Sequence, residues 1–588
     1  MKWDLSQLVE SADPDRVVDK LERMVEDAER FAAAHRDKID TMSPPSLKAF
    51  LEARDELFVR YEGVTSYCSL LYSADTTDPL TKKLNDLARK AETRAEQKLA
   101  FLDIALGQLL TSRPELIKDP VLAEYEHYLE RIRRSAPYLL GESEERLVLA
   151  KDENGVYAWS FLQGEWLSTR MFKIMVDGKE SVLPYGQMVG LYDSPDRELR
   201  QRAISTVYEE LGKDEIIWSG ALRAICSDHL QMCEWRHYPS PLAPSLLSND
   251  VEQEAIEALM RTMKRSASVY QEYLRLKARM MGLPKLGNWD IMAPLPSAPS
   301  KSYSWQEAHD IIVAAYAGFD RQFGEWVEGM YSQGHIDGEA RKGKVSGAFC
   351  ASWYAGKSAY ILQSFNGRTY DLYTQAHELG HAVHDHLAER AQRPSNFHMS
   401  YCVAECGSIF GELLLTDHLI QNAESKEEER GILAYVLDNF GQAAFQVSAR
   451  YCFERSLYDA IQSGIFLDGE KVAERWTKAR DEVYGDTVEW MPMMKWEWAM
   501  KMHYYIPNFR FYNYPYVFAQ LFVFALYRLY KEQGEAFVPR LRRLLEAGSS
   551  RSAAALAQEV GFDIGTEAFW QKGIDQAEEF VRRLERTL

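Results

Sequence analysis

His377-Glu378-Leu379-Gly380-His381 is the stretch from which the fold and the chemistry of this chain can be worked out. Two imidazoles four residues apart lie one above the other on a helix face, close enough to bind a single Zn²⁺. The glutamate after the first histidine is placed to act on a water molecule at the metal. Helical periodicity is supported by an apolar stripe at Ala376, Leu379, Ala382 and Val383. The stretch therefore predicts an amphipathic helix that carries a zinc site of the HExxH type.

A second apolar helix is expected from about residue 401 to residue 415, and it carries two acids. Glu405 follows His381 after 23 intervening residues, and Glu412 lies seven residues further on. Seven residues are two helical turns, so both carboxylates share a face. An acid on an apolar helix is costly to bury unless it is paired or bound to metal. We therefore predict Glu405 as the third zinc ligand and Glu412 as a group that orients a ligand histidine.

Three protein ligands leave the fourth position of a tetrahedral site open for water, which is typical of catalytic zinc. The predicted ligands are His377, His381 and Glu405, with Glu378 as the general base. The expected cofactor is thus one Zn²⁺ per chain, although spacing does not distinguish zinc from cobalt or manganese.

The composition narrows the range of partners. The 588 residues carry a formal net charge of -19, and no basic block offsets it, which argues against nucleic acid or an anionic membrane surface. The start, Met1-Lys2-Trp3-Asp4, resembles neither a signal peptide nor a transit peptide, and no apolar run is long enough to span a bilayer. We expect a cytoplasmic protein, and its oligomeric state stays open.

Seven cysteines in a chain of this length are few and odd in number, which fits free thiols in a reducing compartment. Cys402 and Cys406 flank Glu405 at helical spacing, so they could be interpreted as metal ligands. We favour packing thiols, because the HExxH motif already supplies better placed ligands. Cys350 is interpreted in the same way.

The remaining pattern is mostly helical. Helices are expected to start at Asp13-Pro14 and Asp78-Pro79, whose apolar residues keep helical spacing, and a β-hairpin is expected around Asp177-Gly178. Residues 283–299 contain four prolines and are expected to form an extended connection. We predict two domains, an N-terminal helical lobe with a small hairpin (residues 1–200) and a catalytic domain (residues 201–588).

Two short strands, residues 344–350 and 359–365, are expected to lead into the zinc helix and to form a small β-sheet beside it. A strand next to a hydrolytic metal can hold an extended peptide by backbone pairing. Gly347 would let that peptide approach closely, and it is our candidate substrate-binding residue in this segment. A purely structural hairpin that supports the site is an equally good interpretation.

An aromatic segment downstream contains His503, Tyr512, Tyr514 and Tyr516. Aromatic stripes are usually core, and several of these side chains are expected to be buried. Peptide hydrolysis on zinc, however, builds negative charge on the carbonyl oxygen, and a phenol or imidazole donor would stabilise that charge.

Together these residues resemble the oligoendopeptidase F and thimet oligopeptidase family of zinc metallopeptidases, and most widely its bacterial oligoendopeptidase F branch. The resemblance covers nearly the whole chain. Its most specific parts are residues 377–384, 403–405, 412, 343–350, 361–367, 511–516 and 569–570.

The resemblance implies a mainly α fold, a two-lobed helical body with a deep substrate channel that admits short unfolded peptides and excludes folded proteins. His377, His381 and Glu405 match the zinc ligands of the family, and Glu378 matches its general base. The implied activity is zinc-dependent cleavage of internal peptide bonds in oligopeptides.

The resemblance also implies that His503 and Tyr516 stabilise the oxyanion and grip the substrate, with Tyr512 and Tyr514 as candidate substrate-binding residues. It leaves open which of the three tyrosines donates to the oxyanion, because the tyrosine spacing differs between branches.

Two other functions are compatible with part of this pattern. Zinc aminopeptidases also use HExxH with a later glutamate, but they place it after about 18 residues and need acidic groups for the substrate amine. A peptide-binding protein with a structural metal would not need Glu378, because a structural zinc uses no general base.

Overall fold

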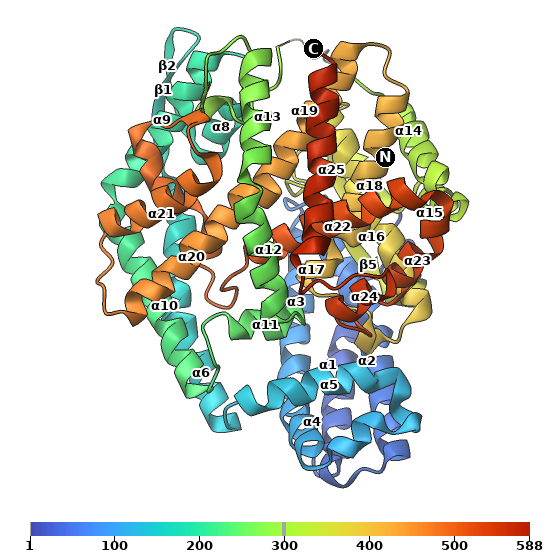
Figure 1. Ribbon diagram of the computed structural model, residues 1–588. Helices are drawn as coiled ribbons and strands as arrows, with labels where there is room; N and C mark the ends of the chain where they lie inside the picture. Colours follow the sequence, from blue (N-terminus) through green and yellow to red (C-terminus); the bar gives the residue numbers. More distant parts are fainter. Residues whose placement is uncertain (1, 297–300) are drawn as a thin grey trace. The chain divides into compact units, whose positions relative to one another are not determined.

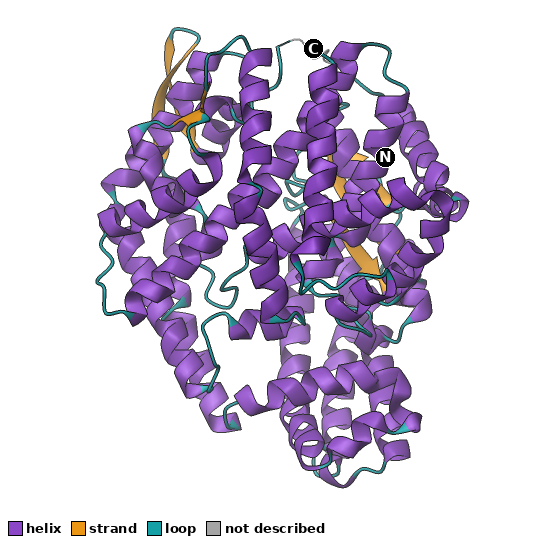
Figure 2. Cartoon of the chain, viewed as in Figure 1, coloured by secondary structure: helices purple, strands orange, loops and turns teal. Residues whose placement is uncertain are grey.

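The computed structural model describes residues 2–296 and 301–588, and helices dominate them (Figure 2). In this part of the chain the strands form three small sheets, two with two strands and one with three strands. The prediction of a mainly α fold with a small sheet beside the HExxH helix is therefore confirmed. Residues 297–299, the end of the predicted extended connection, lie outside the described residues.

The chain divides into two compact units, and each is built from three separate stretches. The first unit comprises Met1–Leu139, Ser300–Gln421 and Leu529–Phe562, and the second comprises Leu140–Pro299, Asn422–Arg528 and Asp563–Leu588. The predicted boundary at residue 200 does not coincide with this division. Hydrophobic periodicity indicates which face of a helix is buried, but it does not indicate which distant segment covers that face.

The first unit holds the following elements (Figure 1): α1 (Pro14–His35), α2 (Pro44–Ala74), α3 (Pro79–Leu99), α4 (Phe101–Ser112), α5 (Glu126–Ser135), α14 (Trp305–Phe319), α15 (Arg321–Ser332), β4 (Ile336–Glu339), β5 (Phe349–Trp353), β6 (Ser358–Phe365), α16 (Thr369–Ala391), α17 (Tyr401–Ala404), α18 (Cys406–Gln421), α23 (Val538–Glu546) and α24 (Ala553–Glu559).

The second unit holds α6 (Glu142–Asn154), α7 (Tyr157–Thr169), β1 (Met171–Val176), β2 (Lys179–Pro184), α8 (Tyr185–Gly190), α9 (Arg197–Lys213), α10 (Glu215–Trp235), α11 (Ala243–Asn249), α12 (Gln253–Arg265), α13 (Ala267–Met280), β3 (Leu286–Gly287), α19 (Lys426–Phe440), α20 (Val447–Gln462), α21 (Gly469–Tyr484), β7 (Val488–Glu489), α25 (Glu567–Arg586) and the part of α22 (Tyr514–Gln533) that ends at Arg528.

The predicted starts of the N-terminal helices are confirmed. The Asp13 carboxylate accepts a hydrogen bond from the backbone of Asp15, and the Asp78 carboxylate accepts from Leu80 and Thr81. Such side chains satisfy the unpaired N–H groups of the first turn, and proline follows each cap where its missing N–H costs nothing. The buried faces of α1, α2 and α3 share one core, to which Tyr360 of β6 also belongs. This core joins the N-terminal helices to the sheet beside α16.

The three-stranded sheet has β6 at its centre, antiparallel to β5 and parallel to β4. The predicted second strand matches β6, but the first strand begins at Phe349 rather than at residue 344. Lys344 explains the difference, because its buried ammonium donates to the Asp337 carboxylate at 2.7 Å and to the backbone oxygen of Gln363. Those bonds hold residues 344–348 as a loop across the ends of β4 and β6.

The predicted hairpin is formed by β1 and β2, whose register runs from Met171↔Pro184 to Val176↔Lys179. Both turn residues have positive φ, 51° at Asp177 and 74° at Gly178. This is the combination that a two-residue hairpin of type I′ requires.

Helices α16 and α18 approach each other closely at two glycines. A Cβ on Gly380 would lie 2.3 Å from the backbone oxygen of Gly407, and a Cβ on Gly407 would lie 2.3 Å from the backbone oxygen of Gly380. No side chain fits between the helices there. Within the described residues, no helix combines the length and apolarity that crossing a bilayer requires.

We expect Gly380→Ala to destabilise the protein by about 1–3 kcal/mol, because the added methyl group meets the backbone of Gly407 and Ser408 and forces α16 and α18 apart. Gly318→Ala in α14 is the matched control, since a Cβ there meets no heavy atom within 4 Å. The control should be neutral or slightly stabilising. Thermal unfolding midpoints test the pair, and equal midpoints for both variants would contradict the described helix contact.

Candidate active site

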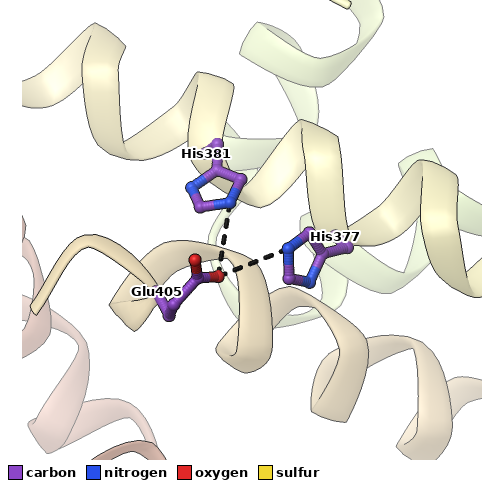
Figure 3. Close-up of side chains that lie close together, drawn as sticks. All are labelled: His377, His381 and Glu405. Atoms are coloured by element: carbon purple, nitrogen blue, oxygen red, sulfur yellow. Dashed lines mark ion pairs between the residues drawn. The ribbon is translucent and has the colours of Figure 1, made fainter. Parts of the chain in front are cut away.

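Three predicted ligands converge between α16 and the start of α18 (Figure 3). The Nε2 atoms of His377 and His381 each lie 3.3 Å from Oε2 of Glu405. All three ligand atoms lie within 4.8 Å of one another, and this set is the metal-binding candidate among the described residues. Figure 3 shows both imidazole rings directed toward the carboxylate. The structure therefore brings together the metal set that the sequence predicts.

The spacing of these donors fits a zinc ion. Zinc binds imidazole nitrogen and carboxylate oxygen at about 2.0–2.2 Å, so the edge of a tetrahedral site measures about 3.3 Å. Both nitrogen–oxygen distances, 3.3 Å, match that edge. Burial acts to raise the pKa of Glu405, but its hydrogen bonds with the two histidines outweigh burial and hold that pKa well below its usual value. The carboxylate is thus in the ionised form that a metal needs.

Glu405 does not lie inside a helix, contrary to the predicted continuous helix over residues 401–415. Helix α17 ends at Ala404, Glu405 has φ −83° and ψ 5°, and α18 begins at Cys406. The Ser408 hydroxyl donates to Oε2 of Glu405 at 2.7 Å. The break in the helix and this hydrogen bond together direct the carboxylate toward the imidazoles.

Glu412 performs the orienting contact that its spacing predicts. Its Oε1 lies 2.6 Å from Nδ1 of His377, while Nε2 of the same ring faces Glu405. The carboxylate thereby holds the ring with a proton on Nδ1 and directs Nε2 toward Glu405, where a bound metal would replace the proton on Nε2. Burial acts to lower the pKa of His377, but the contacts with Glu405 and Glu412 outweigh it and raise the pKa well above its usual value.

A cavity of about 410 Å³ is lined by the two ligand histidines, His377 and His381, and we call it the metal pocket. Glu378 lines it, and burial raises the pKa of its carboxyl. A carboxylate with a raised pKa is a better proton acceptor near neutral pH than an exposed one. One wall is the outer strand β5, which contributes Phe349, Cys350 and Ser352.

Sequence reasoning missed a further acid in the metal pocket. Asp385 accepts a hydrogen bond from Ser352 at 2.7 Å, and burial raises the pKa of its carboxyl to about 6. Asp385 lies four residues after His381, so the helical spacing that relates the two histidines would have placed it on the same face. Glu389, one turn further, is almost fully buried, and burial raises its pKa to about 10.

The cysteines behave as the packing interpretation expects. Cys402 and Cys406 are fully buried, and burial raises the pKa of both thiols. Burial likewise raises the pKa of Cys350 well above its usual value, although this side chain lines the metal pocket. All three are therefore protonated thiols, which are weak metal ligands.

Gly347 lies in the loop that precedes β5, with φ 91°. A Cβ there would meet no heavy atom within 4 Å, so the space above the backbone is open. The next residue, Ala348, lines the metal pocket.

The predicted oxyanion residues belong to the second unit. His503 stacks on Tyr512 with ring centroids 5.4 Å apart, and Tyr516 lies edge-on to His503 at 6.0 Å and to Tyr512 at 5.4 Å. Tyr516 is 39% exposed. Burial, assisted by Arg450 and Lys501, lowers the pKa of His503 to about 4, so its ring is neutral at pH 7 and carries one N–H donor.

A buried ion pair supports the loop that carries these aromatic side chains. Arg510 lies 2.9 Å from Oε1 of Glu454, and the Glu454 carboxylate also accepts from the Phe511 backbone and the Asn513 amide. Phe511 has a positive φ of 58°, which costs free energy for a residue other than glycine. The bonds to Glu454 compensate that cost.

Tyr514 is a correction to the predicted substrate-binding set. Its side chain has no exposed surface, and its hydroxyl donates to the backbone oxygen of Ser245 at 3.1 Å. Tyr514 begins α22 and lies edge-on to Tyr451 of the same unit, while Tyr512 and Tyr516 contact each other. The core interpretation holds for Tyr514, because a buried phenol cannot reach a peptide.

A helical protein in which an HExxH helix and a later glutamate converge has the site of a metallopeptidase. Comparison with known families agrees, because residues 191–576 match the model of "Peptidase family M3" and residues 114–170 match "Oligopeptidase F". The first match covers more than half of the chain. The chain therefore belongs to peptidase family M3, and it is a metalloendopeptidase, a hydrolase of peptide bonds.

Individual relatives agree with this assignment. The chain is 25% identical to the group B oligopeptidase PepB of Streptococcus agalactiae, over 99% of this chain and 96% of the relative. It is 23% identical to the oligopeptidase PepF of Bacillus subtilis, over 91% and 81%. Among solved structures, a putative peptidase from Chlamydophila abortus shares the fold with a TM-score of 0.89 at 22% identity, covering 100% of this chain and 98% of that chain.

We expect Glu412→Gln to weaken zinc binding about 10- to 100-fold, because the amide lacks the charge that orients His377 and strengthens its Nε2 as a donor. Asp417→Asn on the same helix is the matched control, since Asp417 pairs with Lys531 away from the ligands. Competition with a chromogenic chelator measures both affinities. Equal affinities in the two variants would contradict the orienting role.

Proposed function

We propose that this protein is a zinc-dependent endopeptidase that hydrolyses internal bonds of short unfolded oligopeptides. The observation that carries the proposal is the convergence of His377, His381 and Glu405 at the edge length of a zinc tetrahedron, with Glu378 lining the same pocket. The names of the relatives, oligopeptidases in Streptococcus agalactiae and Bacillus subtilis, support oligopeptides as the substrate class.

In this proposal His377, His381 and Glu405 hold the metal. When bound, Zn²⁺ supplies Lewis-acid polarisation of the scissile carbonyl and of the attacking water. Glu378 takes the proton of that water on its carboxylate and delivers it to the leaving amine nitrogen. The raised pKa of Glu378 suits both steps, because the carboxylate must accept a proton and then release it. Glu412 keeps His377 oriented throughout.

The oxyanion donors in this proposal are the phenol of Tyr516 and the neutral ring of His503, with Tyr512 as a substrate-binding neighbour. Their mutual ring contacts and the partial exposure of Tyr516 support the assignment. A donor whose hydrogen bond strengthens as charge develops on the carbonyl oxygen lowers the activation barrier, while it changes the affinity for the substrate little.

The substrate backbone is proposed to pair with β5, at the level of Gly347 and the residues that follow it. β5 is an outer strand of its sheet, so one edge carries no described strand, and its residues line the metal pocket. Backbone pairing is independent of side chains and suits varied peptides. We also place the protein in the cytoplasm, which its seven free cysteines support.

We expect Glu378→Gln to retain zinc and to lose orders of magnitude in turnover, because the amide cannot accept the proton of the attacking water. The assay is hydrolysis of an internally quenched peptide of about ten residues, blocked at both ends, with and without chelator. Blocked ends exclude an aminopeptidase as the source of activity. A near-normal rate in the variant would contradict the mechanism, and peptide binding without cleavage by the zinc-loaded wild type would indicate a binding protein.

We expect Tyr516→Phe to raise the activation barrier by about two to four kcal/mol, mainly through kcat, because it removes an oxyanion donor. Tyr514→Phe is the matched control, since it removes a buried phenol of the same segment that hydrogen-bonds with Ser245 of the second unit. The control should lower thermal stability slightly and leave kcat near normal. The reverse result would reassign the donor to Tyr514.

A further inference from the structure

A second cavity adjoins the metal pocket within the first unit, and we call it the distal pocket. Its volume is about 500 Å³, and Phe397 and His398 line both cavities. The other walls come from α1, α2, α3 and α5, together with Tyr354 and the segment from Pro394 to His398. The distal pocket therefore lies next to the place where a peptide would be cleaved, but on the far side of Phe397 and His398.

The lining of the distal pocket is mainly apolar and aromatic. The apolar and aromatic side chains include Met24, Leu57, Phe58, Tyr61, Tyr128 and Phe397. Phe58 is 50% exposed, which is unfavourable for a large apolar side chain unless something covers it. The Arg54 guanidinium lies over the rings of Phe58 and Tyr128, at 5.6 Å and 5.2 Å from their centroids. An apolar cavity with a few polar groups at its wall is the usual form of a ligand site.

Buried polar contacts hold the walls of the distal pocket in place. The Asp55 carboxylate accepts hydrogen bonds from the hydroxyl groups of Tyr125 and Ser395, which ties the segment before Phe397 to α2. Glu62 accepts from the backbone N–H groups of Tyr354 and Ala355 at 2.7 Å and 2.9 Å. These two acids are thus engaged in the wall, and a cavity with fixed walls binds a ligand at a lower entropic cost.

The charges at the distal pocket do not favour an ionic occupant. Glu92 and Glu96 of α3 line it together with Arg54 and Arg131, so both signs are present. Apolar surface is the feature that all walls share. A phenylalanine or similar side chain bound there would contact the rings of Phe58 and Tyr128. It would also shield the exposed part of Phe58 from water.

We propose that the distal pocket binds a large apolar side chain, above all an aromatic one, of the oligopeptide that is being cleaved, at a residue removed from the scissile bond. The proposal rests on the proposed function, because the peptide must lie across the metal pocket for its chain to pass Phe397 and His398. Selectivity would then depend on a residue that does not touch the reacting atoms, and binding there lowers KM or raises kcat/KM for peptides that carry it.

The test is a set of blocked, internally quenched peptides in which one phenylalanine is moved through an otherwise alanine-rich sequence. Product masses identify the cleaved bond, and kcat/KM is measured for each peptide with zinc-loaded protein. We expect phenylalanine at one position away from the scissile bond to raise kcat/KM roughly tenfold over alanine, as burial of such a side chain predicts.

Three variants connect this preference to the pocket. Phe58→Ala removes one wall, and Val59→Trp fills the cavity from a half-buried position on α2. Leu80→Ala is the control, since Leu80 is 44% exposed on α3 and does not line the pocket. Within each variant, the ratio of kcat/KM for the phenylalanine peptide to that for the alanine peptide is the readout. We expect the ratio to fall toward one in Phe58→Ala and Val59→Trp and to stay near tenfold in Leu80→Ala.

A ratio that stays unchanged in both pocket variants would overturn the proposal. So would a tenfold advantage for lysine instead of phenylalanine at that position, because the occupant would then be a cation held by Glu92 and Glu96. Absence of cleavage of every peptide by the wild-type protein would instead contradict the proposed function on which the inference rests.

Discussion

The site depends on the direct backbone contact of α16 with α18 at Gly380 and Gly407. Gly380 lies between the two imidazoles on one helix, and Gly407 lies two residues after Glu405 on the other. Because no side chain separates the helices there, the carboxylates of Glu405 and Glu412 reach Nε2 and Nδ1 of the histidines. A larger interhelical distance would leave these four partly buried titratable groups without their partners, which is costly.

The acids on and around α16 differ in their partners and in their protonation states. Glu405 and Glu412 are paired with imidazoles, Glu378 faces the metal pocket with a raised pKa, and Asp385 is held by Ser352. Glu389 is buried and has no hydrogen bond to its carboxyl oxygens, so it stays protonated at neutral pH. The acids on and around α16 thus include ionised and neutral groups, and the differences follow from burial and partners.

Much of the site could be predicted from local spacing. The four-residue period placed His377 and His381 together, and the two-turn interval predicted the contact of Glu412 with a histidine. The break of the helix at Glu405 could not be predicted, because its apolar flanks continue the helical pattern.

Spacing in the sequence does not predict features that depend on tertiary contacts. Strand β4 and the loop at residues 344–348 follow from the buried Lys344–Asp337 pair, which no sequence period reveals. The burial of Tyr514 follows from its hydrogen bonds with Ser245, far away in sequence. The distal pocket joins helices near residue 60 to a segment near residue 397, so its lining appears only in the folded chain.

The most direct test of the zinc site is anomalous diffraction, measured above and below the zinc absorption edge. The crystals are grown from protein that is purified without added metal and then supplied with one equivalent of zinc. The account predicts one strong anomalous peak, bonded to Nε2 of His377, Nε2 of His381 and the Glu405 carboxylate at about 2.0–2.2 Å. A peak elsewhere in the chain, or none at these three side chains, would contradict it.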